Sequence, residues 1–299
     1  MAAVQLHVIY RSTGRENRKP RPAYYSKHAS LLSFLRAREA CAEPGDLVFL
    51  NGGPIAAERL AVMEATGAVE AHDDLELYES YWAALRVVEE RPWSPGDLVY
   101  FAEDDYLYRR DALASLVEAA RVIPEADYMA PYATVGREMP NGEPLRPGLR
   151  CPRDRRAGVW RIGGSEWRPG TSHTSSFAVR AGALRADLRL HRIAVRCSGT
   201  WDHALALAYQ GRAPYGPLEL FDELADRGRA PLARRAKVTA WRISLTALAL
   251  ARLRSGRLLV APRPALVTHL EDGVMAVGTD WAAEHEAALR WGTSRLPSG

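Results

Sequence analysis

The chain has 299 residues, of which 47% are hydrophobic and 25% are charged, and its formal net charge is +4. These proportions exclude a disordered chain and are typical of a globular protein with a sizeable core. No run approaches the roughly 18 uninterrupted apolar residues of a membrane span.

The charge is unevenly distributed along the chain. Segment 227–270 contains ten basic residues and no acidic ones. Such a segment can contact nucleic acid, an anionic lipid surface or an anionic substrate, and it can equally be a solvated basic face.

The cysteines and the first ten residues indicate the cellular compartment of the protein. Cys41, Cys151 and Cys197 show no zinc or redox spacing, so we expect reduced thiols. Residues 1–10 lack the pattern of a signal peptide. We therefore expect a cytoplasmic protein, with peripheral contact to a membrane through segment 227–270 as an open alternative.

The first 130 residues alternate predicted strands and helices. Residues 4–10 predict a strand, and residues 27–40 carry apolar side chains at helical spacing. The sequence PGDLVFL at 44–50 returns almost unchanged as PGDLVYF at 95–101. Each copy is a turn followed by a short apolar run, which is typical of a strand buried on both faces of a sheet.

A helix is predicted after each copy, beginning at Pro54 and near Asp111. A further strand is predicted over 126–130. This alternation favours an α/β fold with a mostly parallel, doubly wound central sheet and helices on both faces.

The pattern changes after this region. Residues 137–170 are rich in proline, glycine and arginine without periodicity, and they predict a long loop or excursion of a kind that is often functional. The remaining predicted elements are a strand over 174–180, a helix over 200–209 with Thr200 as N-cap, a helix over 239–253 and two short strands within 257–270.

Several common enzyme motifs are absent from the sequence. There is no G-x-G-x-x-G after the first strand, no P-loop and no G-x-S-x-G nucleophile elbow. These absences disfavour dinucleotide-dependent enzymes, P-loop enzymes and hydrolases.

The strand predicted at 98–102 leads directly into Glu103, Asp104 and Asp105. Ligands of open α/β sheets bind at the carboxyl ends of strands. Glu103 and Asp105 lie two residues apart, so in an extended segment they share a face, while Asp104 points elsewhere. A hard divalent cation would relieve the repulsion between them. Capping of the following helix by these acidic residues is the alternative.

The strand ending in EDDYL at 103–107, followed by RRDAL at 109–113, resembles the acidic motif of GT-A-fold glycosyltransferases of the family-2-like group. In that family the motif holds the metal that binds the donor diphosphate. The resemblance therefore implies Mn²⁺ or Mg²⁺ as cofactor, Glu103 and Asp105 as metal ligands, and Asp104 beside the nucleotide.

Two further segments match the part of the family that binds the nucleotide. Tyr10, Arg11 and Ser12 end the first strand, and Asn51 and Gly52 follow the second. The family often has an aspartate where Asn51 and Gly52 stand.

Two late segments also match in order. Asp202 opens a predicted helix and resembles the carboxylate that acts as catalytic base, whereas its alternative role is that of an acidic first-turn residue. His269 ends a late strand and resembles the histidine that completes the metal site. His173 and the polar turn after it fall where the family has an acceptor-side loop, although a simple turn explains them equally.

The resemblance implies one GT-A-like domain over 1–299, with a nucleotide-sugar-binding half at 1–130 and an acceptor-binding half at 131–299. It implies metal-dependent, inverting transfer of one sugar from a nucleotide-diphosphate sugar to an acceptor hydroxyl that the sequence does not identify. Ala287 occupies the glutamine position of the Gln-x-x-Arg-Trp motif of processive members, which favours a non-processive enzyme.

Two alternatives remain open. A nucleotidyltransferase acting on a sugar phosphate would use the same acidic strand end, and the glycine-rich basic loop of such enzymes is echoed only faintly by RSTGR at 11–15. Independently of this alternative, Arg21 and Lys27 could each contact a phosphate, and a solvated position is the other interpretation. A non-catalytic protein would use segment 227–270 to bind nucleic acid or membrane; under the main interpretation no nucleic acid is expected.

Overall fold

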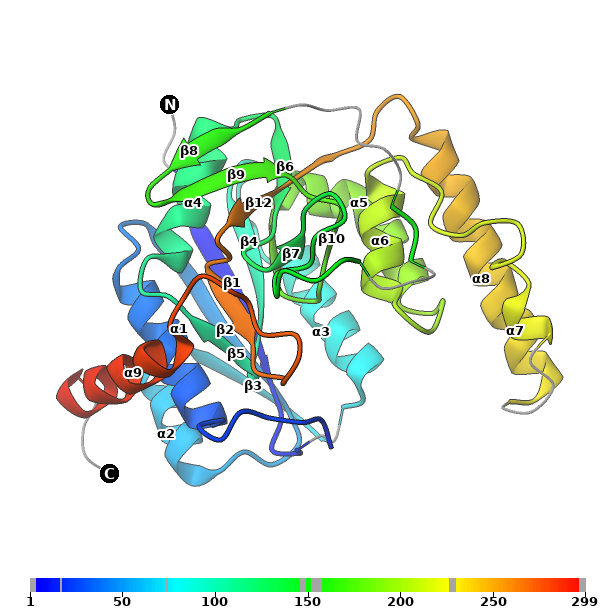
Figure 1. Cartoon of the computed structure of the whole chain (residues 1–299). Coiled ribbons are helices and arrows are strands. Elements are labelled where there is room, and N and C mark those ends of the chain that lie inside the picture. The colour runs from blue at the N-terminus through cyan, green and yellow to red at the C-terminus, as the bar shows by residue number, and fades with distance from the viewer. Residues whose placement is uncertain are drawn as a thin grey trace.

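Nine strands form one central sheet in a computed structural model that describes residues 4–16, 18–73, 75–145, 149–151, 158–225 and 230–295. The strand order is β3-β2-β1-β4-β11-β6-β12-β9-β8 (Figure 1). The bounds are β1 Leu6–Ser12, β2 Pro44–Gly52, β3 Ala68–His72, β4 Leu98–Glu103, β6 Ala126–Met129, β8 Trp160–Ile162, β9 Ser165–Pro169, β11 Phe177–Arg180 and β12 Leu258–Arg263.

Only β11 and β9 run against the direction of the other strands of this sheet. The prediction of a mostly parallel α/β sheet is therefore confirmed. Two short antiparallel ladders lie beside the sheet. They pair β7 (Ala133–Thr134) with β10 (Ser172–His173), and β5 (Tyr106–Tyr108) with β13 (Val267–His269).

Helices cover both faces of the sheet, as predicted (Figure 1). Alternate residues of a strand point to opposite faces, so β1 sends Val8 and Tyr10 into one core and Ile9 into the other. The first core includes α1 Lys27–Glu39, α2 Ala57–Thr66, α4 Ala112–Val122 and α9 Trp281–Arg295. The second includes α3 Leu77–Glu90, α5 Ala181–Ala194, α6 Trp201–Tyr209 and α8 Leu232–Ala251, with the short α7 Asp222–Ala225 before α8.

Several boundaries differ from the sequence prediction. Helix α2 begins at Ala57 rather than Pro54, because Ala56 is still extended, with φ −54° and ψ 135°. Helix α8 begins at Leu232 rather than residue 239. The proline-rich region after residue 137 includes the edge strand β8 and its neighbour β9, and Trp167 of β9 is fully buried.

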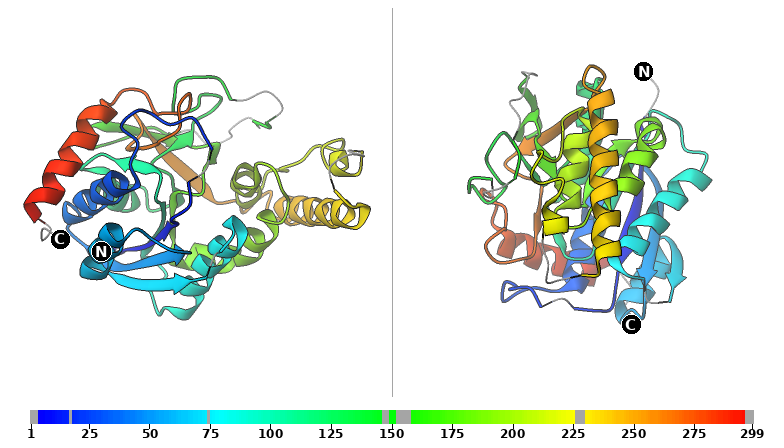
Figure 2. Two further views of the ribbon diagram at one scale, coloured as in Figure 1. Left: turned by 90° about the horizontal axis from the view of Figure 1, so that it is seen from below. Right: turned by 90° about the vertical axis from the view of Figure 1, so that its right-hand side faces the viewer.

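Helix α8 projects from the side of the molecule, as the left view of Figure 2 shows. Among the described residues no helix combines the length and apolar character needed to cross a bilayer.

A buried polar network links α5 to the sheet. The imidazole of His191 is hydrogen-bonded by Tyr81 Oη at 2.7 Å and Tyr128 Oη at 3.0 Å. Tyr128 donates its hydroxyl hydrogen to Asp187 and therefore accepts from His191 Nε2, and Asp187 pairs with Arg257 at 3.2 Å. Burial lowers the pKa of His191 to about 3, so this ring is neutral in the folded protein at physiological pH.

This network predicts a loss of stability in acid. Because the folded pKa of His191 lies below its ordinary value of 6.5, the unfolded chain binds a proton more readily as the pH falls below 6.5. We expect this residue alone to lower the free energy of unfolding by about 1 kcal/mol between pH 7.5 and 5.5. Urea unfolding at both pH values measures this change in the free energy of unfolding. In His191→Gln the free energy of unfolding should fall less between the two pH values. An equal fall in that variant would contradict the attribution of the pH dependence to His191.

Candidate active site

The acidic strand end lies at the carboxyl edge of the sheet, between the ends of β1 and β13. Strand register places Arg11 opposite Glu103, and the guanidinium contacts the carboxylate at 2.5 Å. Burial raises the pKa of Glu103 above its usual range, although the charge of Arg11 opposes this shift. Glu103 is thus a partly buried carboxylate with a single close arginine.

Asp104 points away from its two acidic neighbours. Its carboxylate accepts from the backbone N–H of Thr13 at 2.9 Å and lies 3.2 Å from Lys27 Nζ and 3.5 Å from Arg59 Nη1. Burial raises the pKa of Asp104, with Lys27 and the Thr13 hydrogen bond opposing. The side chain therefore anchors the loop that follows β1.

Lys27 and a glycine fix this loop. Lys27 Nζ donates to the carbonyls of Thr13 at 2.8 Å and Arg15 at 2.6 Å. A Cβ on Gly14 would lie 1.8 Å from the carbonyl oxygen of Pro54, so only glycine fits there. The loops after β1 and β2 are thereby packed against each other.

Asp105 forms the third charged contact of the strand end. Its carboxylate lies 3.0 Å from His269 Nε2 and 3.1 Å from Arg21 Nη2. Burial alone would raise the pKa of Asp105, but the hydrogen bond and charge of His269, together with Arg21, hold it well below its usual range. His269 Nδ1 in turn lies 3.5 Å from Glu271.

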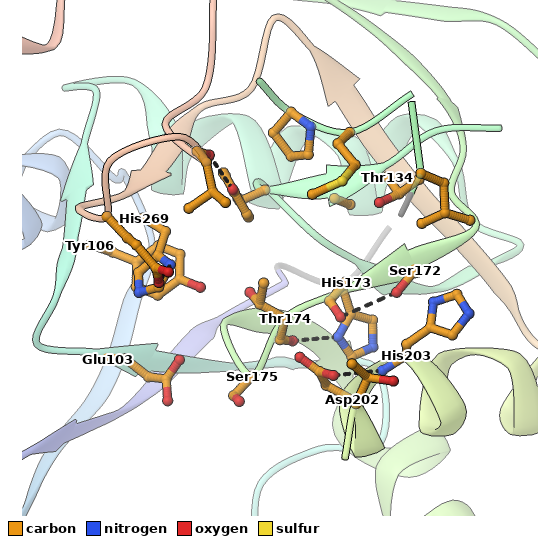
Figure 3. A pocket seen from close by; sticks show the side chains of 18 of the residues that line it. Glu103, Tyr106, Thr134, Ser172, His173, Thr174, Ser175, Asp202, His203 and His269 are labelled. Carbon is orange, nitrogen blue, oxygen red and sulfur yellow. Dashed lines mark hydrogen bonds and ion pairs between the residues drawn. The ribbon is translucent and has the colours of Figure 1, made fainter. Parts of the chain in front are cut away.

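These groups open onto a cavity of about 560 Å³ (Figure 3). Glu103, Asp105 and His269 line one side of it, and Asp202 lines the other. Four of the residues predicted for the site, from segments far apart in the chain, therefore share one cavity.

Asp202 is held in the first turn of α6, where its carboxylate accepts from the backbone N–H of His203 at 2.8 Å. The wall around it is rich in hydroxyl groups and includes Thr134, Ser172, Thr174 and Ser175 (Figure 3). His173 joins this wall, and burial lowers its pKa to about 4. This side of the cavity is polar and, apart from Asp202, neutral.

The residues predicted to bind the nucleotide lie outside this cavity. Tyr10 is fully buried against Phe34 and Phe49, with ring centroids 5.0 and 5.6 Å away. Asn51 is 2% exposed and donates to the sulfur of Met63 at 3.6 Å. The other members of this set, Arg11, Ser12, Gly52 and Asp104, do not line the cavity either. A nucleotide-binding role for these residues stays a prediction.

The structure brings two of the three residues predicted to hold a metal into contact, and the metal itself stays a prediction. Asp105 and His269 are adjacent, and their 3.0 Å separation suits two neighbouring ligands of one ion. Glu103 is turned to Arg11 instead. Among the described residues no three His, Cys, Asp or Glu side chains gather closely enough to hold an ion.

Sequence reasoning considered Arg21 only as a phosphate ligand or a solvated residue, did not single out Lys19, and paired neither with the acidic residues. Lys19 lines the cavity and pairs with Glu271 at 2.7 Å. Arg21 contacts Asp105 and donates to the carbonyl of Leu270 at 2.5 Å. The available signal was the run of basic residues after the first strand, at positions 15, 18, 19, 21 and 27.

No family model and no curated protein matches the chain. Among solved structures, a 4-diphosphocytidyl-2C-methyl-D-erythritol synthase matches with a TM-score of 0.37 and 14% identity, covering 69% of this chain and 84% of that one. A CMP:2-keto-3-deoxy-manno-octonic acid synthetase complexed with CTP matches with a TM-score of 0.38 and 16% identity, covering 62% and 78%.

These matches correct the functional prediction. Both proteins are nucleotidyltransferases rather than glycosyltransferases, so they agree with the alternative and not with the main interpretation. The acidic motif is a short pattern that does not distinguish these two classes of enzyme, so the nucleotidyltransferase alternative replaces the expectation of a family-2-like glycosyltransferase. At this similarity the matches assign no residue and no substrate to this chain, so the argument on function rests on its own cavity.

Proposed function

We propose that the chain catalyses nucleotidyl transfer to a sugar phosphate. An oxygen of the acceptor phosphate attacks the α-phosphorus of a nucleoside triphosphate and forms a new P–O bond. The bond from the α-phosphorus to the oxygen bridging to the β-phosphate breaks, and pyrophosphate leaves. The observation that carries the proposal is the basic loop after β1, whose Lys19 and Arg21 reach the acidic edge of the cavity.

The ion pairs between this loop and the cavity favour a ligand that brings charge of both signs. Lys19 is paired with Glu271 and Arg21 with Asp105. A triphosphate would replace the carboxylates as partner of both cations, since phosphate oxygens are strong acceptors for lysine and arginine. The released carboxylates would then face a divalent cation that accompanies the triphosphate.

We propose Asp105 and His269, with Glu103 on the same side of the cavity, as the residues that would hold this Mg²⁺ or Mn²⁺. Their oxygen and imidazole donors fit either ion. When bound, the metal would neutralise charge on the phosphates. Lys19 and Arg21 supply positive charge at the same edge and would stabilise the departing pyrophosphate.

The opposite wall suits a polyhydroxylated acceptor. Thr134, Ser172, Thr174 and Ser175 present hydroxyl groups that can both donate and accept hydrogen bonds. In this proposal Asp202 accepts hydrogen bonds from sugar hydroxyls and orients the acceptor. A phosphate nucleophile is already deprotonated at neutral pH, so the base role predicted for Asp202 is not required.

The direct test is pyrophosphate release. Incubation with CTP, UTP, ATP, GTP or dTTP, a panel of sugar phosphates and Mg²⁺ or Mn²⁺ should release pyrophosphate with one nucleotide. Release should need the acceptor and should stop with EDTA. A coupled pyrophosphatase assay measures it. Failure of every combination, or equal release without acceptor, would refute nucleotidyl transfer.

Replacing both loop cations should weaken nucleotide binding. In Lys19→Gln/Arg21→Gln the two positive partners of the triphosphate are lost, and we expect KM for the nucleotide to rise by at least about tenfold. Initial rates against nucleotide concentration measure this change. Arg18→Gln, an exposed arginine of the same loop, is the matched control and should keep the wild-type KM. Equal effects of both variants would show that only general charge matters.

Asp202→Asn separates orientation from base catalysis. If Asp202 only binds acceptor hydroxyls, KM for the sugar phosphate should rise about tenfold while kcat changes little. Loss of kcat by ~10²-fold or more, with KM unchanged, would instead indicate a general base. Asp222→Asn, which removes an exposed carboxylate outside the cavity, is the control and should leave both constants unchanged.

A further inference from the structure

A second cavity, of about 320 Å³, lies between α3 and α8 and shares no lining residue with the first. Tyr78 and Trp82 of α3 line it together with Trp241 of α8. Figure 2 shows α8 standing out from the rest of the molecule, so this cavity opens on a projecting part of the structure. Its walls combine aromatic rings with cations, which is a different chemistry from the hydroxyl-rich first cavity.

Arg196 is held in place by two indole rings of this cavity. Its guanidinium carbon lies 4.1 Å from the ring centroid of Trp82 and 4.9 Å from that of Trp241. Stacking of this kind satisfies the faces of a guanidinium but leaves the N–H groups in its plane available. Within the described residues the Arg196 side chain makes no hydrogen bond or ion pair. The cavity thus contains an oriented arginine with unused donors.

Two further cations complete the group. Arg234 and Lys237 line the same cavity, both are exposed, and neither side chain is hydrogen-bonded or ion-paired in the part of the chain that the structure describes. The one acidic residue in the lining is Glu79, whose carboxylate accepts from the backbone N–H of Glu76 at 3.2 Å. Three cations therefore face one carboxylate.

Other arginines of the same basic segment are used internally. Arg235 donates to the carbonyl of Glu223 at 2.8 Å, and Arg242 pairs with the Glu223 carboxylate at 2.8 Å. Arg257 pairs with Asp187 at 3.2 Å. The contrast shows that packing alone does not account for the cations around the second cavity, because arginines elsewhere on α8 and after it find partners.

We propose that this second cavity binds a phosphate group attached to an apolar body. Arg196, Arg234 and Lys237 would hold the phosphate oxygens. Trp82, Trp241 and Tyr78, which is 41% exposed, would contact the apolar part. A membrane phospholipid and a free phosphorylated amphiphile share this chemistry. The proposal does not depend on nucleotidyl transfer.

The probe is dihexanoylphosphatidic acid below its micelle concentration, with glycerol 3-phosphate as the same anion without an apolar body. Tryptophan fluorescence should report binding, since two indoles line the cavity, and isothermal titration calorimetry should give the affinity. We expect the lipid to bind more tightly than glycerol 3-phosphate. Arg234→Gln/Lys237→Gln should weaken lipid binding by at least about tenfold. Both residues are exposed, so this variant should fold.

The matched control is Arg254→Gln, which removes an exposed cation from the same basic segment outside the cavity. It should retain wild-type affinity for the lipid. Equal affinity in the wild type and the double variant, or an equal loss in the control, would overturn the proposal. Arg196→Gln, checked by circular dichroism, should show the same loss as the double variant.

Vesicles of phosphatidylcholine with and without phosphatidic acid distinguish the two sources of the ligand. Cosedimentation with the acidic vesicles that is lost in the double variant would support the proposal and identify a membrane phospholipid. Binding of the soluble lipid without cosedimentation would support it and identify a free phosphorylated amphiphile. Absence of both kinds of binding would refute the proposal for the second cavity. This outcome would leave the proposed nucleotidyl transfer standing, because pyrophosphate release tests that function separately.

Discussion

Three consecutive carboxylates at the end of one buried strand constrain the rest of this structure. Such a cluster repels itself strongly where solvent is partly excluded. Glu103 is paired with Arg11, Asp104 with Lys27, and Asp105 with His269 and Arg21. These partners come from β1, α1, β13 and the loop after β1, so one electrostatic requirement determines how the carboxyl edge of the sheet is assembled.

The same compensation shapes the cavity chemically. Asp104 is used for structure, since it anchors the loop through Thr13 and is turned away from the cavity. Glu103 and Asp105 remain at the cavity wall, each matched by an arginine. An anion alone would take the arginines and leave these carboxylates without a partner of opposite charge. A cation alone would take the carboxylates and leave the arginines without one. A ligand that carries both, such as a nucleoside triphosphate with its divalent ion, would exchange the Asp105–Arg21 pair without leaving either charge unpaired.

The sequence predicted the elements whose signal is local. Continuous apolar runs predicted β1, β2 and β4, and the two-residue spacing of Glu103 and Asp105 predicted a shared cavity wall apart from Asp104. It did not predict that Arg21 meets Asp105, because that contact joins positions 84 residues apart through the tertiary fold. Likewise, Tyr10 and Asn51 are buried because helices pack over both faces of the sheet, and the sequence of a strand does not indicate how far the helices cover its end.

The basic segment 227–270 shows why a charge run does not define a surface. Read as a run, its ten basic residues suggest one anion-binding face. A helix distributes neighbouring residues around its axis at 100° intervals, so positions only a few residues apart enter different environments. Arg242 is 8% exposed and paired with Glu223 of α7, whereas Arg234 and Lys237 line the second cavity. Within the described residues only some cations of the segment are left without a partner, and Arg234 and Lys237 are the two of these that line the second cavity.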